Sequence, residues 1–179
     1  LEARINNHLG TLYWENGRTE KSLSCYKEAY RNYEMEQNKI GMTNTLRNIG
    51  KSMHGLEKLD SAYFYLDRAF VFAKNENLES QMAYILSSMG SIYAEKGLYE
   101  KALAYRKESL NYSRIQNTKS SCYYAIGESY VNIQKLDSAL LYVDSALMSK
   151  DLYVKCSANW LLYTICLKKQ DYKKACTYN

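Results

Sequence analysis

Residues 49–69 read IGKSMHGLEKLDSAYFYLDRA, and residues 126–146 read IGESYVNIQKLDSALLYVDSA. Both stretches place an apolar residue before a glycine, an alanine at the twelfth position after that glycine, and a second alanine at the nineteenth. The same frame recurs along the chain, so the sequence is an internal repeat, and the repeat decides the fold class. Four copies start from an anchor glycine, at spacings of 40, 40 and 37: Gly10, Gly50, Gly90 and Gly127.

Other positions of the frame carry similar residues in each copy. At the third position after the glycine stand Tyr13, Met53, Tyr93 and Tyr130. Small residues follow at the twelfth and nineteenth positions, namely Ser22, Ala62, Ala102 and Ala139, then Ala29, Ala69, Ser109 and Ala146. A fifth, weaker copy has Tyr163 in place of the glycine. We predict one array over residues 1–179, with repeats at about 3–42, 43–82, 83–119 and 120–155 and a partial repeat at 156–179.

The frame has a physical cause in helix packing. A glycine within a helix costs about 1 kcal/mol relative to alanine, so its recurrence at one phase predicts a contact where a Cβ would clash. The two small positions lie two helical turns apart and mark one face of a second helix. Each repeat is therefore predicted to be a pair of antiparallel helices. The predicted packing positions are Gly10, Gly50, Gly90, Gly127, Ala62, Ala102 and Ala139.

The predicted turns and helix ends carry residues that favour these places. Between the helices of each pair stand Asn16-Gly17, Lys58-Leu59, Lys96-Gly97 and Gln134-Lys135. The second helix then begins with an acid, which the helix dipole favours: Glu20, Asp60, Glu100 or Asp137. Asparagine tolerates the left-handed conformation that ends helices, so second helices are predicted to end near Gln37-Asn38, Glu76-Asn77 and Gln116-Asn117. Gly41 is predicted to lie between repeats.

The composition argues against several classes of protein. The chain has no proline and only eight glycines, with 46% apolar and 24% charged residues, which favours a folded, largely helical chain over a disordered one. The net charge of +5 comes from no strongly basic segment, so a nucleic-acid surface is not indicated. No apolar run approaches the roughly 20 residues that a membrane-spanning helix needs.

The five cysteines and two histidines give weak support for a metal site or a disulfide framework. No two cysteines have C-x-x-C spacing, and His8 and His54 fall in different repeats. We interpret the cysteines as free thiols in the core, which favours a reducing compartment such as the cytoplasm, while a periplasmic location stays open. Phosphate-binding glycine loops, G-x-S-x-G and H-E-x-x-H are absent. We therefore predict neither a cofactor nor an enzyme.

The recurring frame resembles the tetratricopeptide repeat family over essentially the whole chain. The resemblance implies an all-α, right-handed α-solenoid of antiparallel helix pairs, in which the first helices line a concave binding face. The chain departs from the family in lacking the proline near the end of the second helix and in its longer spacing. Longer repeats resemble those of kinesin light chains and of bacterial peptide-sensing regulators. The tracts KLDSAYFYLDRAF and KLDSALLYVDSAL are similar to the sensor regions of bacterial regulators.

The resemblance implies a non-catalytic module that binds a protein or peptide segment. Two settings stay open for it. One is the sensing or interaction region of a larger bacterial regulator, either a transcriptional regulator or a sensor kinase. The other is a free-standing scaffold or adaptor that assembles a complex. An output domain encoded beyond residue 179 would support the first, and an immediate stop the second. A helical repeat that binds nucleic acid is a weaker alternative.

The first helices supply the candidate residues of the binding face: Asn7, Arg47, Asn48, Lys51, His54, Tyr84 and Tyr124. Arg47 and Lys51 lie one helical turn apart, and we hypothesise that they bind an acidic side chain or a C-terminal carboxylate. The two asparagines are candidates for hydrogen bonds to an extended backbone, and the two tyrosines for contact with an apolar side chain. The alternative is that Arg47 and Lys51 are only solvated surface charges.

Two further expectations concern specific partners. The carboxylate clamp of chaperone-binding family members needs a set of lysine, asparagine and arginine residues on three consecutive first helices, of which only Asn48 fits in the first frame. No binding to chaperone C-terminal tails is therefore predicted. An incomplete terminal repeat leaves apolar surface that needs a cover. Residues 151–179, which include Trp160 and Leu161, are thus predicted either to be followed by more chain or to pair with a second copy.

Overall fold

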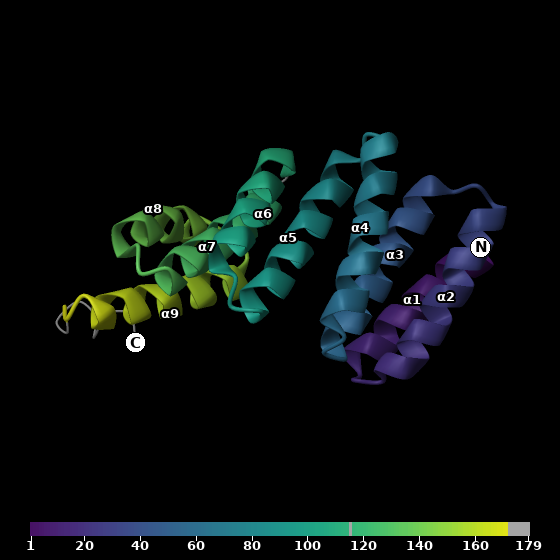
Figure 1. Cartoon of the computed structure of the whole chain (residues 1–179), viewed down its shortest axis with the longest axis horizontal. Helices are drawn as coiled ribbons and strands as arrows, with labels where there is room; N and C mark the ends of the chain where they lie inside the picture. Colours follow the sequence, from purple (N-terminus) through teal and green to yellow (C-terminus); the bar gives the residue numbers. More distant parts are fainter. Residues whose placement is uncertain (115, 172–179) are drawn as a thin grey trace. The chain divides into compact units, whose positions relative to one another are not determined.

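The computed structural model describes residues 1–114 and 116–171, with the backbone alone described at 116 and 117. Within these residues the chain forms nine helices and no strand (Figure 1). The predicted all-α helical repeat is therefore confirmed. The helices are α1 (Glu2–Glu15), α2 (Thr19–Met35), α3 (Lys39–Gly55), α4 (Leu59–Asn75), α5 (Glu79–Glu95), α6 (Tyr99–Tyr112), α7 (Gln116–Asn132), α8 (Leu136–Leu147) and α9 (Leu152–Lys168).

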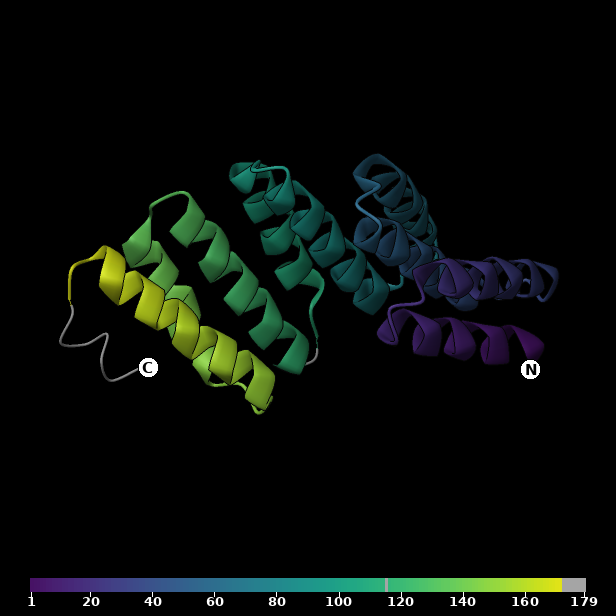
Figure 2. The same cartoon turned by 90° about the horizontal axis from the view of Figure 1, so that it is seen from below.

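The helices fall into two compact units, Leu1–Ile92 and Tyr93–Asn179. In the first unit α1 packs against α2 and α3 against α4, and α2 also packs against α3, so that two helix pairs stack (Figures 1 and 2). In the second unit α6 packs against α7, and α8 and α9 both pack against α7 and against each other. Helix α5 begins in the first unit and ends in the second.

The anchor glycines lie where one helix of a pair meets the other. A Cβ at Gly50 would lie 2.8 Å from Cγ of Leu66 and 3.2 Å from the carbonyl oxygen of Ala62. At Gly127 the corresponding distances are 2.9 Å to Cγ2 of Val143 and 3.5 Å to the carbonyl oxygen of Ala139. Gly10 meets the ring of Tyr26 at 2.7 Å. The side chain that fills the gap stands at the sixteenth position after the glycine in all three cases. Gly90, Ala62, Ala102 and Ala139 are also buried.

Tyrosine pairs close the helix hairpins of the second unit. Tyr93 stacks on Tyr105 with ring centroids 5.2 Å apart, and Tyr130 stacks on Tyr142 at 5.5 Å. Both pairs join the third and fifteenth positions after the anchor glycine. Such aromatic contacts stabilise a pair of helices beyond simple area burial, which gives several of the 19 tyrosines a structural role.

The helix ends differ from prediction at several residues. The left-handed residue that ends α2 is Gln37, with φ of 52°, whereas Asn38 caps α3 by accepting a hydrogen bond from the backbone N–H of Gly41. Asn77 takes the predicted left-handed conformation, with φ of 53°. Gly41 lies inside α3 and not between repeats. The ring of Tyr33 occupies the space that a Cβ at this position would fill. The predicted first-turn acids are confirmed in α2, α4, α6 and α8.

The prediction of a helix end near Gln116-Asn117 is wrong. Helix α6 ends at Tyr112, and Gln116 already begins α7. Ser113 breaks the helix with an extended backbone (ψ of 109°), and its hydroxyl donates a hydrogen bond to the Ser109 carbonyl. The shortening accounts for the shorter repeat, because α6 has 14 residues where α2 and α4 have 17, and the spacing falls from 40 to 37.

The cysteines are only partly in the core. Cys122 and Cys166 are buried, Cys25 is half-buried and Cys156 is exposed, all as free thiols; Cys176 lies outside the described residues. The interpretation of all five as core thiols is therefore wrong for Cys156. No helix in the described part of the chain combines the length and the apolar character needed to cross a membrane.

Candidate functional site

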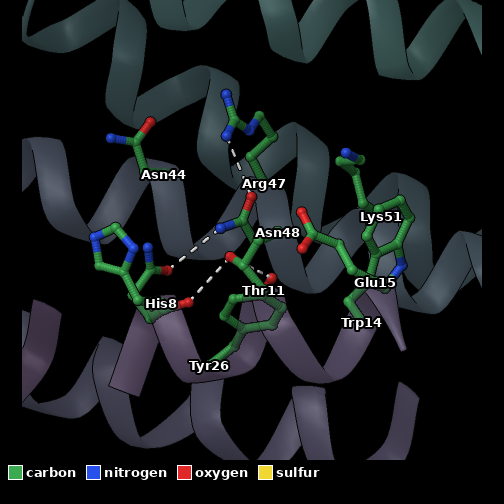
Figure 3. Close-up of a pocket in the computed structure, with 10 residues that line it drawn as sticks. His8, Thr11, Trp14, Glu15, Tyr26, Asn44, Arg47, Asn48 and Lys51 are labelled. Atoms are coloured by element: carbon green, nitrogen blue, oxygen red, sulfur yellow. Dashed lines mark hydrogen bonds between the residues drawn. The ribbon is translucent and has the colours of Figure 1, made fainter. Parts of the chain in front are cut away.

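A pocket of about 370 Å³ opens between α1 and α3 in the first unit (Figure 3). It contains four of the predicted candidates, because positions of the same phase on two stacked first helices face the same side. Tyr26 of α2 contributes a further wall. The ten lining residues are Asn7, His8, Thr11, Trp14, Glu15, Tyr26, Asn44, Arg47, Asn48 and Lys51.

A chain of hydrogen bonds fixes the polar wall of the pocket. Arg47 donates from Nη2 to Oδ1 of Asn48 over 3.2 Å, and Asn48 donates from Nδ2 to Oδ1 of Asn7 over 3.3 Å. The Thr45 hydroxyl donates to the Gly41 carbonyl over 2.8 Å and lies 3.4 Å from the same oxygen of Asn7. Both side-chain oxygens of the asparagines thus accept hydrogen bonds from protein donors. Among the described residues, no hydrogen bond from the amide nitrogen of Asn7 is seen.

Each of the two cations in the pocket lies over an aromatic ring. The guanidinium carbon of Arg47 lies 5.4 Å from the ring centre of Tyr84, and the Lys51 ammonium lies 4.5 Å from that of Trp14. Among the described residues neither cation forms an ion pair with a carboxylate, and the buried Nε of Arg47 has no hydrogen-bond partner. A buried donor without a partner is uncommon and calls for an explanation.

Burial lowers the pKa values of both cations in the pocket. Burial lowers the pKa of the Arg47 guanidinium. Burial also lowers the pKa of the Lys51 ammonium, the charge of Arg47 lowers it further, and the carboxylate of Glu15 raises it in part. Both effects disfavour the charged forms as long as no anion is nearby. The pocket therefore holds two positive charges that a ligand anion would stabilise.

The remaining candidates lie elsewhere. Tyr84 of α5 contacts Arg47 and extends the site in the first unit. His54 lies in the last turn of α3 and is not one of the residues that line the pocket. Tyr124 lies on α7 in the second unit, where its hydroxyl donates to Oε1 of Glu128 over 3.4 Å. Burial, followed by the charge of Glu128, raises the pKa of Tyr124 to about 12.

Arg106 is a buried charge that the sequence analysis missed. Its side chain is 6% exposed and donates from Nη1 to the Ala125 carbonyl and to the Ser129 hydroxyl, both over 2.7 Å. Its Nη2 pairs with Oε2 of Glu128 over 3.1 Å. Arg106 stands at the sixteenth position after Gly90, which is Tyr26, Leu66 and Val143 in the other repeats. A charged residue at a repeat position that is otherwise aromatic or aliphatic was the signal in the sequence for this buried charge.

Six lining residues of the pocket are not among the candidates named above: His8, Thr11, Trp14, Glu15, Tyr26 and Asn44. Four of them share a phase with a candidate on another first helix: Thr11 with Lys51, Trp14 with His54, His8 with Asn48 and Asn44 with Tyr84. Glu15 stands one residue beside the phase of Trp14. Tyr26 was visible as the bulky residue at the sixteenth position after Gly10, but it belongs to a second helix. In the described residues no group of histidine, cysteine, aspartate and glutamate could hold a metal ion.

An apolar stripe lies along the exposed side of α9. Tyr153 is 79% exposed and Trp160 is 62% exposed, and Leu167 continues the stripe. These residues are seven apart and share one helical face, and Trp160 also contacts Tyr163 with ring centroids 5.3 Å apart. Leu161 was paired with Trp160 in the predicted terminal surface, but it faces the core and is only 7% exposed.

Comparison with known sequences gives a family match at the start of the chain. Residues 3–34 match the family model described as "Tetratricopeptide repeat". The chain is also similar to Protein O-mannosyl-transferase TMTC2 of Homo sapiens, with 33% identity over 72 residues. These residues are 40% of this chain and 9% of TMTC2, so the chain spans a small part of that relative.

Comparison with solved structures extends the likeness over nearly the whole chain. BtubC from P. vanneervenii superposes with a TM-score of 0.82 at 20% identity, over 95% of this chain and 74% of that one. A Rap protein complexed with competence and sporulation factor superposes with a TM-score of 0.83 at 16% identity, over 99% of this chain and 52% of that one. Identities this low show the fold alone. The family match over residues 3–34 and the recurring frame support a tetratricopeptide repeat protein, and the solved structures show the same helical-repeat fold.

Proposed function

We propose that this chain is a non-catalytic module that binds a peptide or protein segment, and that the pocket between α1 and α3 binds an acidic group of that segment. The observation that carries the proposal is Arg47. It is a half-buried cation whose Nε has no hydrogen-bond partner and which pairs with no carboxylate of the described residues. A solvated surface charge, the alternative interpretation, has no need of a rigid hydrogen-bonded wall.

Each neighbour of Arg47 has a part in this proposal. Lys51 supplies the second positive charge, and an Arg–carboxylate contact gains strength from its paired N–H donors. The amide hydrogens of Asn7 reach toward a backbone carbonyl of the bound segment. Tyr84 offers an apolar surface beside the guanidinium. Asn48 holds the guanidinium in place through its side-chain oxygen. Binding roles for His54 and for Tyr124 remain predictions.

The setting of the module is a finer proposal. The Rap protein that shares this fold is complexed with competence and sporulation factor. This supports a sensing region of a larger bacterial regulator, in which peptide binding changes the output of another domain. A free-standing scaffold that assembles a complex is the second setting. Because the chain covers about half of the Rap chain, an output domain encoded by the same gene would distinguish the two.

Peptide display tests the binding proposal while the partner is still unidentified. The full chain is immobilised and used to select from two random peptide libraries, one with a free C-terminus and one with a blocked C-terminus. We expect enrichment of an aspartate or glutamate at one position, or of the free C-terminal carboxylate. The enrichment should be lost when the Arg47→Ala, Lys51→Ala variant is used. Selection of peptides without an acidic group would refute the proposal.

A control variant separates the pocket from the overall charge. Lys27→Ala and Arg31→Ala remove two exposed positive charges from α2, so they lower the net charge by the same amount without touching the pocket. This variant should select the same peptides as the unmodified chain. If it loses the acidic peptides as well, their selection reflects only the overall positive charge.

A further inference from the structure

Three side chains that are charged at neutral pH face the pocket. Arg47 and Lys51 come from α3, and Glu15 is the last residue of α1. His8 adds a positive charge only when its imidazole is protonated. With His8 neutral, the pocket carries a formal charge of +1, because the carboxylate cancels one of the two cations.

Glu15 influences the charge of Lys51 without forming an ion pair with it. Its carboxylate raises the pKa of Lys51, so the two groups are coupled electrostatically, and Figure 3 shows the carboxylate reaching into the pocket on the side of Lys51. The two residues nonetheless form no ion pair within 4.0 Å, since the ammonium lies instead over the ring of Trp14. The Lys51 ammonium thus remains available to a ligand, while Glu15 lowers the net positive charge of the pocket.

We propose that Glu15 makes this pocket selective for a group with a single negative charge, so that it accepts a carboxylate and discriminates against a phosphate dianion. The inference rests on the proposed function, because it assumes that the pocket binds an anion. A carboxylate brings the sum of charges in the pocket to zero. A dianion leaves one negative charge in excess beside Glu15, and the cost of removing an ion from water rises steeply with its charge.

The test uses the acidic peptide recovered by display, synthesised in three forms. One form carries the aspartate, the second carries phosphoserine at that position, and the third carries asparagine. Phosphoserine is a dianion above pH 7, so binding is measured at pH 8 by isothermal titration calorimetry. Each form is titrated into the unmodified chain, into Glu15→Gln and into Glu108→Gln.

We expect the unmodified chain to bind the aspartate form more tightly than the phosphoserine form. A single charge at a partly exposed site changes affinity by about threefold. Removing Glu15 should therefore tighten the aspartate form by about threefold and the dianionic form by about tenfold, because the second charge doubles the electrostatic free energy. The asparagine form should bind weakly and equally to all three proteins. Gln is tolerated at position 15, since a carboxylate at the C-terminal end of a helix is disfavoured by the dipole.

Glu108→Gln is the matched control. Glu108 is exposed on α6 in the second unit, so its loss changes the net charge by the same amount without changing the pocket. It should leave all affinities unchanged. If Glu15→Gln strengthens both acidic forms by the same factor, or neither, the selectivity inference is wrong while the binding proposal stands. If the unmodified chain binds the aspartate and asparagine forms equally, the binding proposal itself is wrong.

Discussion

Gly50 and Gly55 lie on the same helix, but only Gly50 lacks room for a side chain. A Cβ at Gly50 would meet Cγ of Leu66 at 2.8 Å, and the nearby backbone oxygen of Ala62 restricts any retreat. At Gly55 the nearest atom is Nε1 of Trp14, at 3.8 Å, which is ordinary contact. The difference tests whether the recurring glycine is needed for close packing.

We predict that Gly50→Ala lowers the free energy of unfolding by about 1–2 kcal/mol, because overpacking outweighs the helix propensity gained. Gly55→Ala should leave this free energy unchanged or raise it by up to about 1 kcal/mol. Urea denaturation followed by circular dichroism measures both. Equal effects of the two substitutions would show that the anchor position has no special packing role.

Lys51 gives the binding reaction a pH dependence. Its pKa is lowered by burial first and by Arg47 second from the usual 10.5, so the ammonium loses its proton at a lower pH than an exposed lysine does. A bound anion favours the charged form. Affinity for an acidic peptide should therefore be higher at neutral pH than at alkaline pH, and it should fall as the Lys51 ammonium loses its proton.

The conservative variant Lys51→Arg checks this assignment, because guanidinium keeps its proton over the whole range. In titrations between pH 7.5 and 10.5 the variant should show a smaller loss of affinity than the unmodified chain. Identical pH profiles for the two proteins would remove Lys51 from the binding reaction.

At the residue scale, the sequence predicted which residues lie together better than it predicted how their side chains are oriented. The repeat frame placed Arg47, Asn48, Lys51 and Asn7 on the binding face of the first helices, and the four line one pocket. The frame did not predict Glu15, because this residue stands one position beside the phase of Trp14. It also did not predict that the asparagines bond to each other, since this requires the separation of α1 and α3.

Helix α6 departs from its counterparts in one buried residue and in length. Arg106 stands at the repeat position of Leu66 and Val143 and donates hydrogen bonds to residues of α7. Its partner Glu128 is 38% exposed and therefore keeps part of its hydration. Buried ion pairs of this kind often contribute little net stability compared with apolar residues of similar volume.

We predict that Arg106→Leu leaves the free energy of unfolding within about 1 kcal/mol of the unmodified value, because leucine fills the space and Glu128 turns to solvent. Arg106→Ala should lower it by about 3 kcal/mol, since it adds a cavity to the lost contacts. Chemical denaturation with urea compares the two. If leucine is as damaging as alanine, the charge itself holds α6 on α7.

The elements were largely predictable because periodicity and turns agree. Helix pairs, their turns and the first-turn acids followed from the repeat frame. The start of α7 did not, because Gln116-Asn117 fits a helix end as well as a helix start, and the extended backbone at Ser113 has no signature in composition. Asn38 was placed correctly at a boundary but given the wrong role, since asparagine both ends helices and caps them.

At the scale of the whole molecule, α9 carries an exposed apolar surface. Tyr153, Trp160 and Leu167 form an exposed apolar stripe. They lie in the segment 151–179, which was predicted either to be followed by more chain or to pair with a second copy. We predict concentration-dependent self-association in sedimentation equilibrium, abolished by Trp160→Glu. Lys155→Glu adds negative charge to another face of α9 and should leave the association intact. A strict monomer at high concentration would refute this pairing.

The central claim is that the pocket between α1 and α3 binds an acidic group through Arg47. A double-mutant cycle tests it most directly, by measuring the affinities of the display-selected acidic peptide and its amide counterpart for the unmodified chain and for Arg47→Ala. The account predicts a coupling free energy of about 1.5–3 kcal/mol, as for a hydrogen-bonded charge pair. A coupling near zero would contradict it, because the acid and Arg47 would then act independently.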